Sequence, residues 1–509
     1  MGITVFAAIY IGSYEVSLKI MEISGKRGIR EIDHVKSRIG IGKNIYQHRK
    51  VETEVMEELC EILSEYEEIM KSYQADDCRA YAGAFLKEAE NVFFVMEQIR
   101  IRTGIQIQIL SNSERRFISY QSVTAKENFE EIIREGAIAV DIGGESIQIT
   151  LFVDGGVVTT QHLVLGTMRL REQLAGISKT GVRFEKQMEE LINKDIEVFK
   201  AMYLKKRQVP YLILMGDYSP ELIRNVSGSG GGITVKTEVV AEFLKDLGRK
   251  DAEDIAEFLG FSYADPLLPP SVVMYRCMVE ELGTKEVWVP GKDISDGMAY
   301  QYAREHRLLK SVHDFDHDIL SAATNLSKRY RSYSPHIDAL TGMATMIFDA
   351  IKKVHGMGER ERLLLQVAAI LHDCGKFISL ANGPDCAYGI IMASEIMGLT
   401  HLERQIVAST VLYNNRPLDP YESVADKLDV ESYMTAAKLA AILRVSNALD
   451  RSHRQKFKTI RVVLKKKELR ITVESEDDII LEKGLLANKS DSFEAIFGIK
   501  PILREKRSF

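Results

Sequence analysis

Residues 137–158 read AIAVDIGGESIQITLFVDGGVV, and the fold prediction depends on this block. An apolar run ends at Asp141, a Gly-Gly turn follows, and an alternating run begins at Ile147. This pattern predicts two strands joined by a tight turn. Glycines at such a turn let backbone N–H groups approach an anion, and an Asp at the strand end can hold a metal ion. A Gly-Gly hairpin is common, so the block alone favours an ordinary turn.

The opening residues, MGITVFAAIYIGSYEVSLKI, repeat this pattern about 130 residues earlier. We expect a strand from Ile3 to Ile11, a Gly-Ser turn and a second strand ending near Ile20. Two copies of one unit predict two related α/β lobes that face each other across a cleft. Between them, residues 50–71 show apolar spacings of three and four, which predict an amphipathic helix.

The pattern changes after Gly297. Residues 300–450 are almost continuously helical in pattern, and alternation returns from about 459 to 482. The fold class is therefore predicted as a two-lobed α/β N-terminal half, then an all-α domain and a small α+β tail. The predicted domains are residues 1–128, 129–300, 301–457 and 458–509.

Composition excludes several classes of protein. The chain has 509 residues, of which 45% are hydrophobic and 28% charged, as in globular proteins. Its net charge of -6 argues against a generic nucleic-acid coat. The five cysteines are scattered without a CxxC pair, which suits reduced thiols. No apolar run reaches the ~20 residues of a membrane span, and the N-terminus has no basic leader, so we expect a soluble, cytoplasmic protein.

Five blocks carry a family resemblance. They are AIYIGSYE (8–15), AGAFLKEAEN (82–91), LSNSERRF (110–117), DIGGESIQ (141–148) and LVLGTMRLRE (163–172). In this order and spacing the chain resembles the Ppx/GppA family of exopolyphosphatases and guanosine pentaphosphate phosphohydrolases. The resemblance implies a ribonuclease H-like fold of the actin and sugar-kinase type, and it extends over nearly the whole chain.

The resemblance also implies a chemistry. Polyphosphate hydrolysis needs a water in line with the terminal phosphorus, a base and cations. Glu114 aligns with the family's base, and Asp141 with a metal-binding Asp. The aligned phosphate-binding residues are Gly12, Ser13, Lys87, Gly143, Gly144 and Ser146. The resemblance further implies Mg²⁺ or another divalent ion, a substrate that is inorganic polyphosphate or a phosphorylated guanosine nucleotide, and a homodimer, without nucleic-acid or membrane partners.

Several substitutions fall on this implied site. Tyr10 replaces a metal-binding Asp, Tyr14 replaces an Asn that touches phosphate, and Gln148 replaces an acidic residue. Lys87 replaces an Arg and so loses the bidentate fork. A further carboxylate, Glu145, replaces a Gly. In a third loop, residues 215–220, the family's glycine pair is gone and Asp217 stands where an anion would lie.

The helical half resembles an HD domain. His372 and Asp373 are adjacent and His336 lies 36 positions upstream, a set that can share one divalent ion. The fourth ligand position carries Asn447, a poorer ligand for a hard cation. A lone His-Asp pair on an apolar helix is more often hydrogen-bonded core. Both interpretations, metal site and structural pair, stay open.

A basic run, residues 451–458, follows that helix. Such a run is usually a solvated face, and the functional alternative is a positive wall for a polyanion. The sequence thus leaves three hypotheses. The first is an exopolyphosphatase-type hydrolase with Glu114 as base. The second is a catalytically degenerate regulatory protein that binds polyphosphate or a nucleotide. The third is a phosphohydrolase that works through the HD-like residues.

Overall fold

The structure is a computed structural model that describes residues 2–175, 184–216, 218–227, 232, 234–260, 266–310 and 313–506. The chain forms two compact units, Met1–Asp314 and Phe315–Phe509. Asp217 and residues 228–231 lie outside the described residues.

The first sheet of the N-terminal unit contains the predicted opening hairpin. Its strands are β1 (Thr4–Ile11), β2 (Glu15–Ser24), β3 (Gly28–Arg38), β4 (Asp77–Ala82) and β5 (Ile107–Ile109). They lie in the order β3-β2-β1-β4-β5. The first three strands are antiparallel neighbours, and β4 and β5 continue the sheet parallel to β1.

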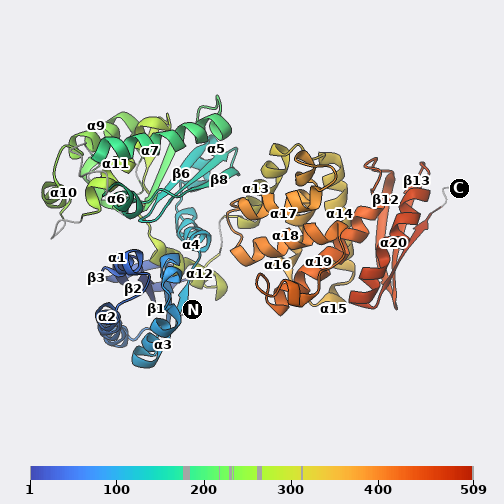
Figure 1. Ribbon diagram of the computed structural model, residues 1–509, viewed down its shortest axis with the longest axis horizontal. Helices are drawn as coiled ribbons and strands as arrows, with labels where there is room; N and C mark the ends of the chain where they lie inside the picture. The colour runs from blue at the N-terminus through green and yellow to red at the C-terminus, as the bar shows by residue number, and fades with distance from the viewer. Residues whose placement is uncertain are drawn as a thin grey trace. The chain divides into compact units, whose positions relative to one another are not determined.

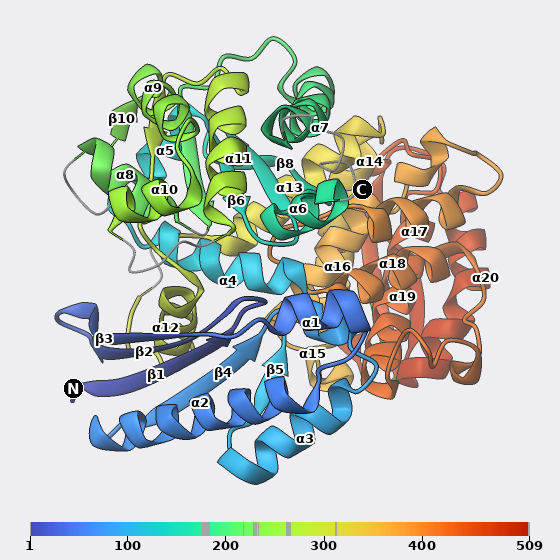
Figure 2. The same ribbon diagram turned by 60° about the vertical axis from the view of Figure 1, so that its left-hand side comes forward.

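Helices cover both faces of this sheet, as Figure 2 shows. Successive strand residues point to opposite faces, so β1 contributes to two cores. Ala7 and Ile9 pack in the core that contains the predicted helix α2 (Thr53–Ser72) and α3 (Val92–Thr103). Phe6 and Ala8 pack in the core that contains α4 (Asn112–Thr124) and α12 (Ile294–Glu305). The chain therefore returns to its first sheet after building the second, and the predicted domain boundary at residue 300 falls within α12.

The second sheet repeats the topology of the first. Its order is β10-β11-β9-β6-β7-β8. Without the edge strand β10 and taken from the other edge, this order is β8-β7-β6-β9-β11. These five strands have the same relative directions as β3-β2-β1-β4-β5 of the first sheet. The bounds are β6 (Ala137–Ile142), β7 (Ile147–Val153), β8 (Gly156–Leu163), β9 (Tyr211–Gly216), β10 (Thr234–Lys236) and β11 (Glu286–Trp288). This shared topology confirms the repeat that the two glycine hairpins predicted.

Helices pack beside the second sheet (Figure 1). The large core joins β6, β7 and β9 to α7 (Phe184–Phe199), α9 (Thr237–Leu247) and α11 (Leu268–Glu281). The remaining helices of this unit are α1 (Ile41–His48), η1 (Ala84–Glu88), α5 (Phe129–Glu135), α6 (Thr167–Ala175), η3 (Lys200–Leu204), α8 (Ser219–Ser227) and α10 (Ala252–Leu259).

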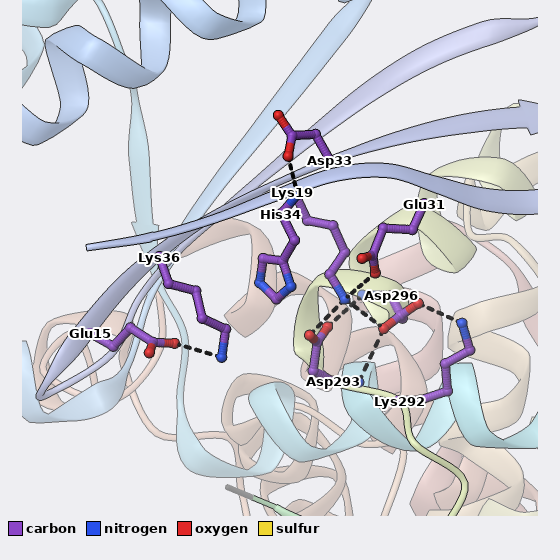
Figure 3. Close-up of polar contacts among 9 residues, drawn as sticks. All are labelled: Glu15, Lys19, Glu31, Asp33, His34, Lys36, Lys292, Asp293 and Asp296. Atoms are coloured by element: carbon purple, nitrogen blue, oxygen red, sulfur yellow. Dashed lines mark hydrogen bonds and ion pairs between the residues drawn. The ribbon is translucent and has the colours of Figure 1, made fainter. Parts of the chain in front are cut away.

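A buried lysine attaches α12 to the first sheet (Figure 3). The side chain of Lys19 on β2 is 4% exposed, and its Nζ lies 2.7 Å from Asp293, 3.0 Å from Asp296 and 3.2 Å from Glu31. Burial acts to lower the pKa of Lys19, but these carboxylates raise it above its ordinary value. Asp293 also caps α12 through a capping box with Asp296. The cluster therefore joins two strands to the start of a helix whose N-cap residue, Asp293, lies 274 residues after Lys19.

The C-terminal unit is helical and ends in a small sheet, as predicted. Its helices are α13 (Phe315–Arg329), α14 (Ser334–Ala350), α15 (Lys352–His355), α16 (Glu359–Leu371), η4 (Cys374–Phe377), α17 (Gly383–Ala393), α18 (His401–Asn415), η5 (Tyr421–Ser423), α19 (Val430–Leu449) and α20 (Ile480–Phe497). The strands β12 (Phe457–Lys465), β13 (Glu468–Ser475) and β14 (Lys500–Glu505) form one sheet.

The sequence pattern placed His372 and Asp373 on an apolar helix, but the structure places them just after one. Helix α16 ends at Leu371, so the pair occupies the turn between α16 and η4. Across the described residues, no helix combines the length and the apolar character needed to span a membrane.

Candidate functional site

Two glycine turns from opposite lobes face each other in the N-terminal unit. The β1–β2 turn closes with a 2.8 Å hydrogen bond from Gly12 N to Glu15 O, and the β6–β7 turn with a 3.1 Å bond from Gly143 N to Ser146 O. A Cβ placed on Gly144 would lie 3.4 Å from Ser13 Oγ. The structure therefore brings together these predicted phosphate-binding residues.

The start of helix α6 is attached to the second of these turns. Thr167 N donates to Gly143 O at 3.2 Å, and the amides of Met168 and Arg169 donate to Gly144 O at 2.9 and 3.2 Å. Gly166 permits this approach, because a Cβ there would lie 2.1 Å from the carbonyl carbon of Glu145. The turn and the helix terminus thus form one block, which explains why glycine is required at position 166.

Glu114 lies in the first turn of α4 and is held by its helix cap. Its Oε2 accepts hydrogen bonds from Ser111 N at 2.8 Å and from Ser111 Oγ at 2.6 Å, completing a capping box. The half-buried carboxylate therefore has a fixed orientation with Oε2 engaged. The next residue, Arg115, contacts Asp141 at the end of β6, so the start of α4 lies beside the glycine turn.

Asp141 is buried and paired with two arginines that sequence reasoning overlooked. Its Oδ2 lies 3.1 Å from Arg115 Nη2 and 3.8 Å from Arg116 Nε. The buried Arg116 also donates to Ser146 Oγ, contacts His162 Nδ1 at 2.7 Å and donates to Gln148 Oε1 at 3.4 Å. The signal was present as the basic pair that follows Glu114 in the SERR segment.

The residues around Asp141 do not fit a divalent cation. Such an ion prefers several carboxylate or carbonyl oxygens. The other two aligned acidic positions carry Tyr10 and Gln148, and the one carboxylate already neutralises guanidinium groups. A metal ion here would face fixed positive charge on α4. These residues do not match the magnesium site expected at Asp141, and the chemistry below uses no step that passes through such an ion.

Glu145 introduces a carboxylate at the glycine turn. Burial raises its pKa above the ordinary value, Arg115 and Arg169 act in the opposite direction, and Glu88 of η1 raises it further. The Nε of Arg169 is buried without a hydrogen-bond partner among the described residues. The turn is thus surrounded by side chains from α4, α6 and η1.

The two substituted tyrosines and Lys87 have distinct positions. The Cε1 of Tyr10 lies 3.6 Å from where a Cβ on Gly12 would be, and its hydroxyl lies 3.2 Å from where a Cβ on Gly83 would be. Tyr14 lies against Arg38 of β3, whose guanidinium carbon is 5.5 Å from the ring centroid. Lys87 is exposed on η1, and its role in phosphate binding stays a prediction.

The helical unit contains a separate cluster of histidines. His336 Nδ1 lies 2.7 Å from Asp450 Oδ2, and His372 Nδ1 lies 2.8 Å from the carbonyl oxygen of Ala369. Both partners are acceptors, so both Nδ1 atoms carry protons. The Nε2 of His336 is buried without a hydrogen-bond partner among the described residues, and the Nε2 of His372 lies 3.2 Å from Asp373 Oδ1.

A carboxylate and a third histidine complete this cluster. Ligand atoms of His336, Asp373 and His453 all lie within 4.8 Å of one another. The His453 ring stacks on His336 with centroids 3.6 Å apart, and burial beside His336 lowers its pKa to about 4. The Oδ1 atom of Asn447 is also buried without a partner among the described residues. Sequence reasoning missed His453 because it lies within the basic run after α19.

Part of that basic run has acidic partners within the unit. Lys456 Nζ lies 3.0 Å from Glu482, whose side chain is fully buried, and Lys458 Nζ lies 2.5 Å from Glu476. These lysines therefore contribute to the internal charge balance of the tail. The polyanion wall stays a prediction.

Comparison with known proteins gives matches over most of the chain. The model of the Ppx/GppA phosphatase family matches residues 20–306, and that of Ppx/GppA phosphatase domain III matches residues 320–491. A guanosine-5'-triphosphate,3'-diphosphate pyrophosphatase of Aeromonas hydrophila is 22% identical over 463 residues, covering 87% of this chain and 86% of the relative. The protein of the same name from Aeromonas salmonicida is 22% identical over 460 residues, with the same coverage.

Solved structures show the same fold. A Ppx/GppA family member of Aquifex aeolicus has a TM-score of 0.50 at 16% identity, covering 62% of this chain and 100% of its own. An exopolyphosphatase from Cytophaga hutchinsonii gives 0.50 at 16% identity, covering 60% and 100%. The two-lobed, actin- and sugar-kinase-like N-terminal half is thereby confirmed, and the HD-like assignment of the helical part stays a prediction.

Proposed function

Because the chain belongs to the Ppx/GppA phosphatase family, we propose that it is a phosphoanhydride hydrolase of the exopolyphosphatase type. Its substrate is inorganic polyphosphate or a phosphorylated guanosine nucleotide, bound between the two glycine turns. The observation that carries this proposal is the convergence of Ser13, Gly143 and Gly144 beside Arg115, the residue next to Glu114.

Glu114 acts as the general base in this proposal. Ser111 fixes Oε2, and Oε1 takes a proton from a water that attacks the terminal phosphorus. The bridging P–O bond breaks, and the shortened phosphate chain leaves with its negative charge stabilised by the guanidinium groups of Arg115 and Arg169. Glycines at the turn allow backbone N–H groups to approach the phosphate oxygens.

The test is phosphate release from long-chain polyphosphate and from guanosine pentaphosphate. A Glu114→Gln variant keeps the capping geometry, since Gln also serves at the third helical position. We expect release to fall by about 10²- to 10⁴-fold with unchanged polyphosphate binding, because only proton transfer is lost. Glu127→Gln, an exposed residue near the same helix, is the matched control and should have no effect.

The outcome separates this proposal from the regulatory alternative. Polyphosphate binding without release by the unmodified protein would support a binding protein that has lost turnover. Release that is insensitive to Glu114→Gln would remove this residue from the mechanism.

A second candidate function concerns the helical unit, where we infer a transition-metal site. The observation that favours it is the set of ligand atoms from His336, Asp373 and His453 within 4.8 Å of one another, with the Nε2 of His336 buried and unpartnered among the described residues. Asp450 orients His336 in the way that outer carboxylates orient metal-binding histidines. Imidazole ligands suit Zn²⁺ and related ions better than Mg²⁺. Such an ion would supply Lewis-acid chemistry to a phosphohydrolase.

Calorimetric titration of the full chain with Zn²⁺ and Mn²⁺ tests this site. We expect one saturable site, weakened about 10- to 100-fold by Asp450→Asn, because the orienting carboxylate is lost. His453→Gln should also weaken binding, and the exposed His401→Gln on α18 should not. Equal heats in all three variants would contradict the assignment.

A further inference from the structure

The charged groups around Asp141 differ from those that a metal-dependent site needs. Of the three positions that the family resemblance makes acidic, two are now Tyr10 and Gln148. The remaining carboxylate is 3% exposed and has Arg115 and Arg116 within 3.1 and 3.8 Å of one oxygen. Positive charge therefore already occupies the place where a cation would balance phosphate oxygens.

The two arginines next to Asp141 differ in exposure, and this separates their roles. The Arg116 side chain is 2% exposed and is held by Ser146, Gln148 and His162, so it is a positioning residue of the turn. The Arg115 side chain is 19% exposed, and its Nη2 lies 3.5 Å from where a Cβ on Gly143 would be. Its guanidinium thus borders the backbone that the phosphate approaches.

A third arginine approaches the turn from α6. Arg169 acts electrostatically on Glu145, and its Nε is buried without a hydrogen-bond partner among the described residues. A buried N–H that makes no hydrogen bond is costly, and an anionic oxygen would satisfy it. Guanidinium groups are permanently charged and form paired hydrogen bonds with phosphate.

We propose that Arg115 and Arg169 replace the divalent cation in this protein, so that the crevice binds phosphate chains without metal. This inference rests on the proposed function, because it concerns the same site. The ligand is a phosphoanhydride in its metal-free form. Free polyphosphate, rather than its magnesium complex, is then the form that binds.

Binding of fluorescently labelled long-chain polyphosphate to the full chain tests the inference. Anisotropy titrations are run in EDTA and in excess Mg²⁺ at equal ionic strength, because phosphate-chain binding depends on salt. We expect binding in EDTA to be at least as tight as in excess Mg²⁺, because magnesium converts part of the free polyphosphate to its complex. Arg115→Met should weaken binding about 10- to 100-fold through the lost charge-assisted hydrogen bonds.

Three further arginine variants serve as controls for Arg115→Met. Arg134→Met removes an exposed arginine from α5 and should leave the affinity unchanged. Arg115→Lys keeps the charge without the fork and should fall between the unmodified protein and Arg115→Met. If Arg115→Met unfolds because Asp141 loses a partner, Arg169→Met provides the same test from α6.

The outcomes distinguish the inference from the proposed function. Binding that weakens more than tenfold in EDTA overturns metal independence and leaves the hydrolase proposal intact. Arginine variants of α4 and α6 that bind as tightly as Arg134→Met also overturn it. Absence of binding in both conditions overturns the proposed function itself.

Discussion

Glu145 is the residue most at odds with an anion site. Its carboxylate lies among Arg115 of α4, Arg169 of α6 and Glu88 of η1, and burial raises its pKa. When ionised it repels phosphate and competes for the same guanidinium groups. Protonation of this one side chain therefore increases the positive potential at the turn.

Replacement of this carboxylate should strengthen phosphate binding. In the unmodified protein, affinity should rise as the pH falls through the raised pKa of Glu145. Glu145→Gln should bind polyphosphate about 3- to 30-fold more tightly at pH 7, since one close like charge is removed. Anisotropy titrations from pH 5 to 8 measure both effects, and Glu127→Gln is the control. A variant that retains the unmodified pH profile would exclude Glu145 as the cause.

Residue roles were only partly readable from the sequence. Glu114, Gly143 and Gly144 could be assigned because they stand in short blocks with fixed spacing. The pairing of Asp141 with Arg115 could not, because it joins two elements whose approach depends on tertiary packing. His453 was overlooked for a similar reason. Its contact with His336 spans more than a hundred residues of chain.

At the scale of elements, the Lys19 cluster explains how α12 is fixed to the first sheet. Three carboxylates surround an almost fully buried ammonium group, and one of them caps the helix. Burial acts to raise the pKa of Asp296, but Lys19 and Lys292 hold it well below its ordinary value. Breaking a buried ion pair from one side leaves an uncompensated charge, which is strongly destabilising.

Loss of the central lysine should therefore weaken the N-terminal unit. Lys19→Met should lower the free energy of unfolding by about 3–5 kcal/mol. The control, Lys292→Met, removes a 30% exposed partner of the same Asp296 and should cost about 1 kcal/mol or less. Urea denaturation followed by circular dichroism measures both. The pKa of Asp296 is lower in the folded protein than its ordinary value of 3.8, so its ion pairs stabilise the fold fully only above that pH. The destabilisation caused by Lys19→Met should therefore shrink as the pH falls below about 4. Equal losses in the two variants would contradict this account.

Strands were the most predictable elements, because alternation and glycine turns are local signals. The opening hairpin and the Ala137 hairpin lie where the sequence placed them. The docking of α12 on β1 and α4 was not predictable, since its apolar residues would suit either sheet. Gly297 marks that contact in retrospect, because a Cβ there would lie 2.0 Å from the carbonyl oxygen of Ile118.

At the scale of the whole molecule, the shared strand order of the two sheets shows that the two lobes repeat one topology. The repeat was visible in the sequence as two glycine hairpins, although the rest of each lobe has diverged. The break between compact units at Asp314 and Phe315 lies near the composition shift after Gly297. The finer division into four domains stays a prediction.

The hydrogen bonds from the start of helix α6 to the glycine turn have a consequence for the affinity of the turn for phosphate. Gly144 O accepts from two amides at the positive end of that helix. A carbonyl engaged in this way draws electron density toward its oxygen, and the N–H on the opposite side of the same peptide plane becomes a stronger donor. Under the proposed function, the helix would therefore strengthen the binding of an oxyanion indirectly, through a polarised peptide group.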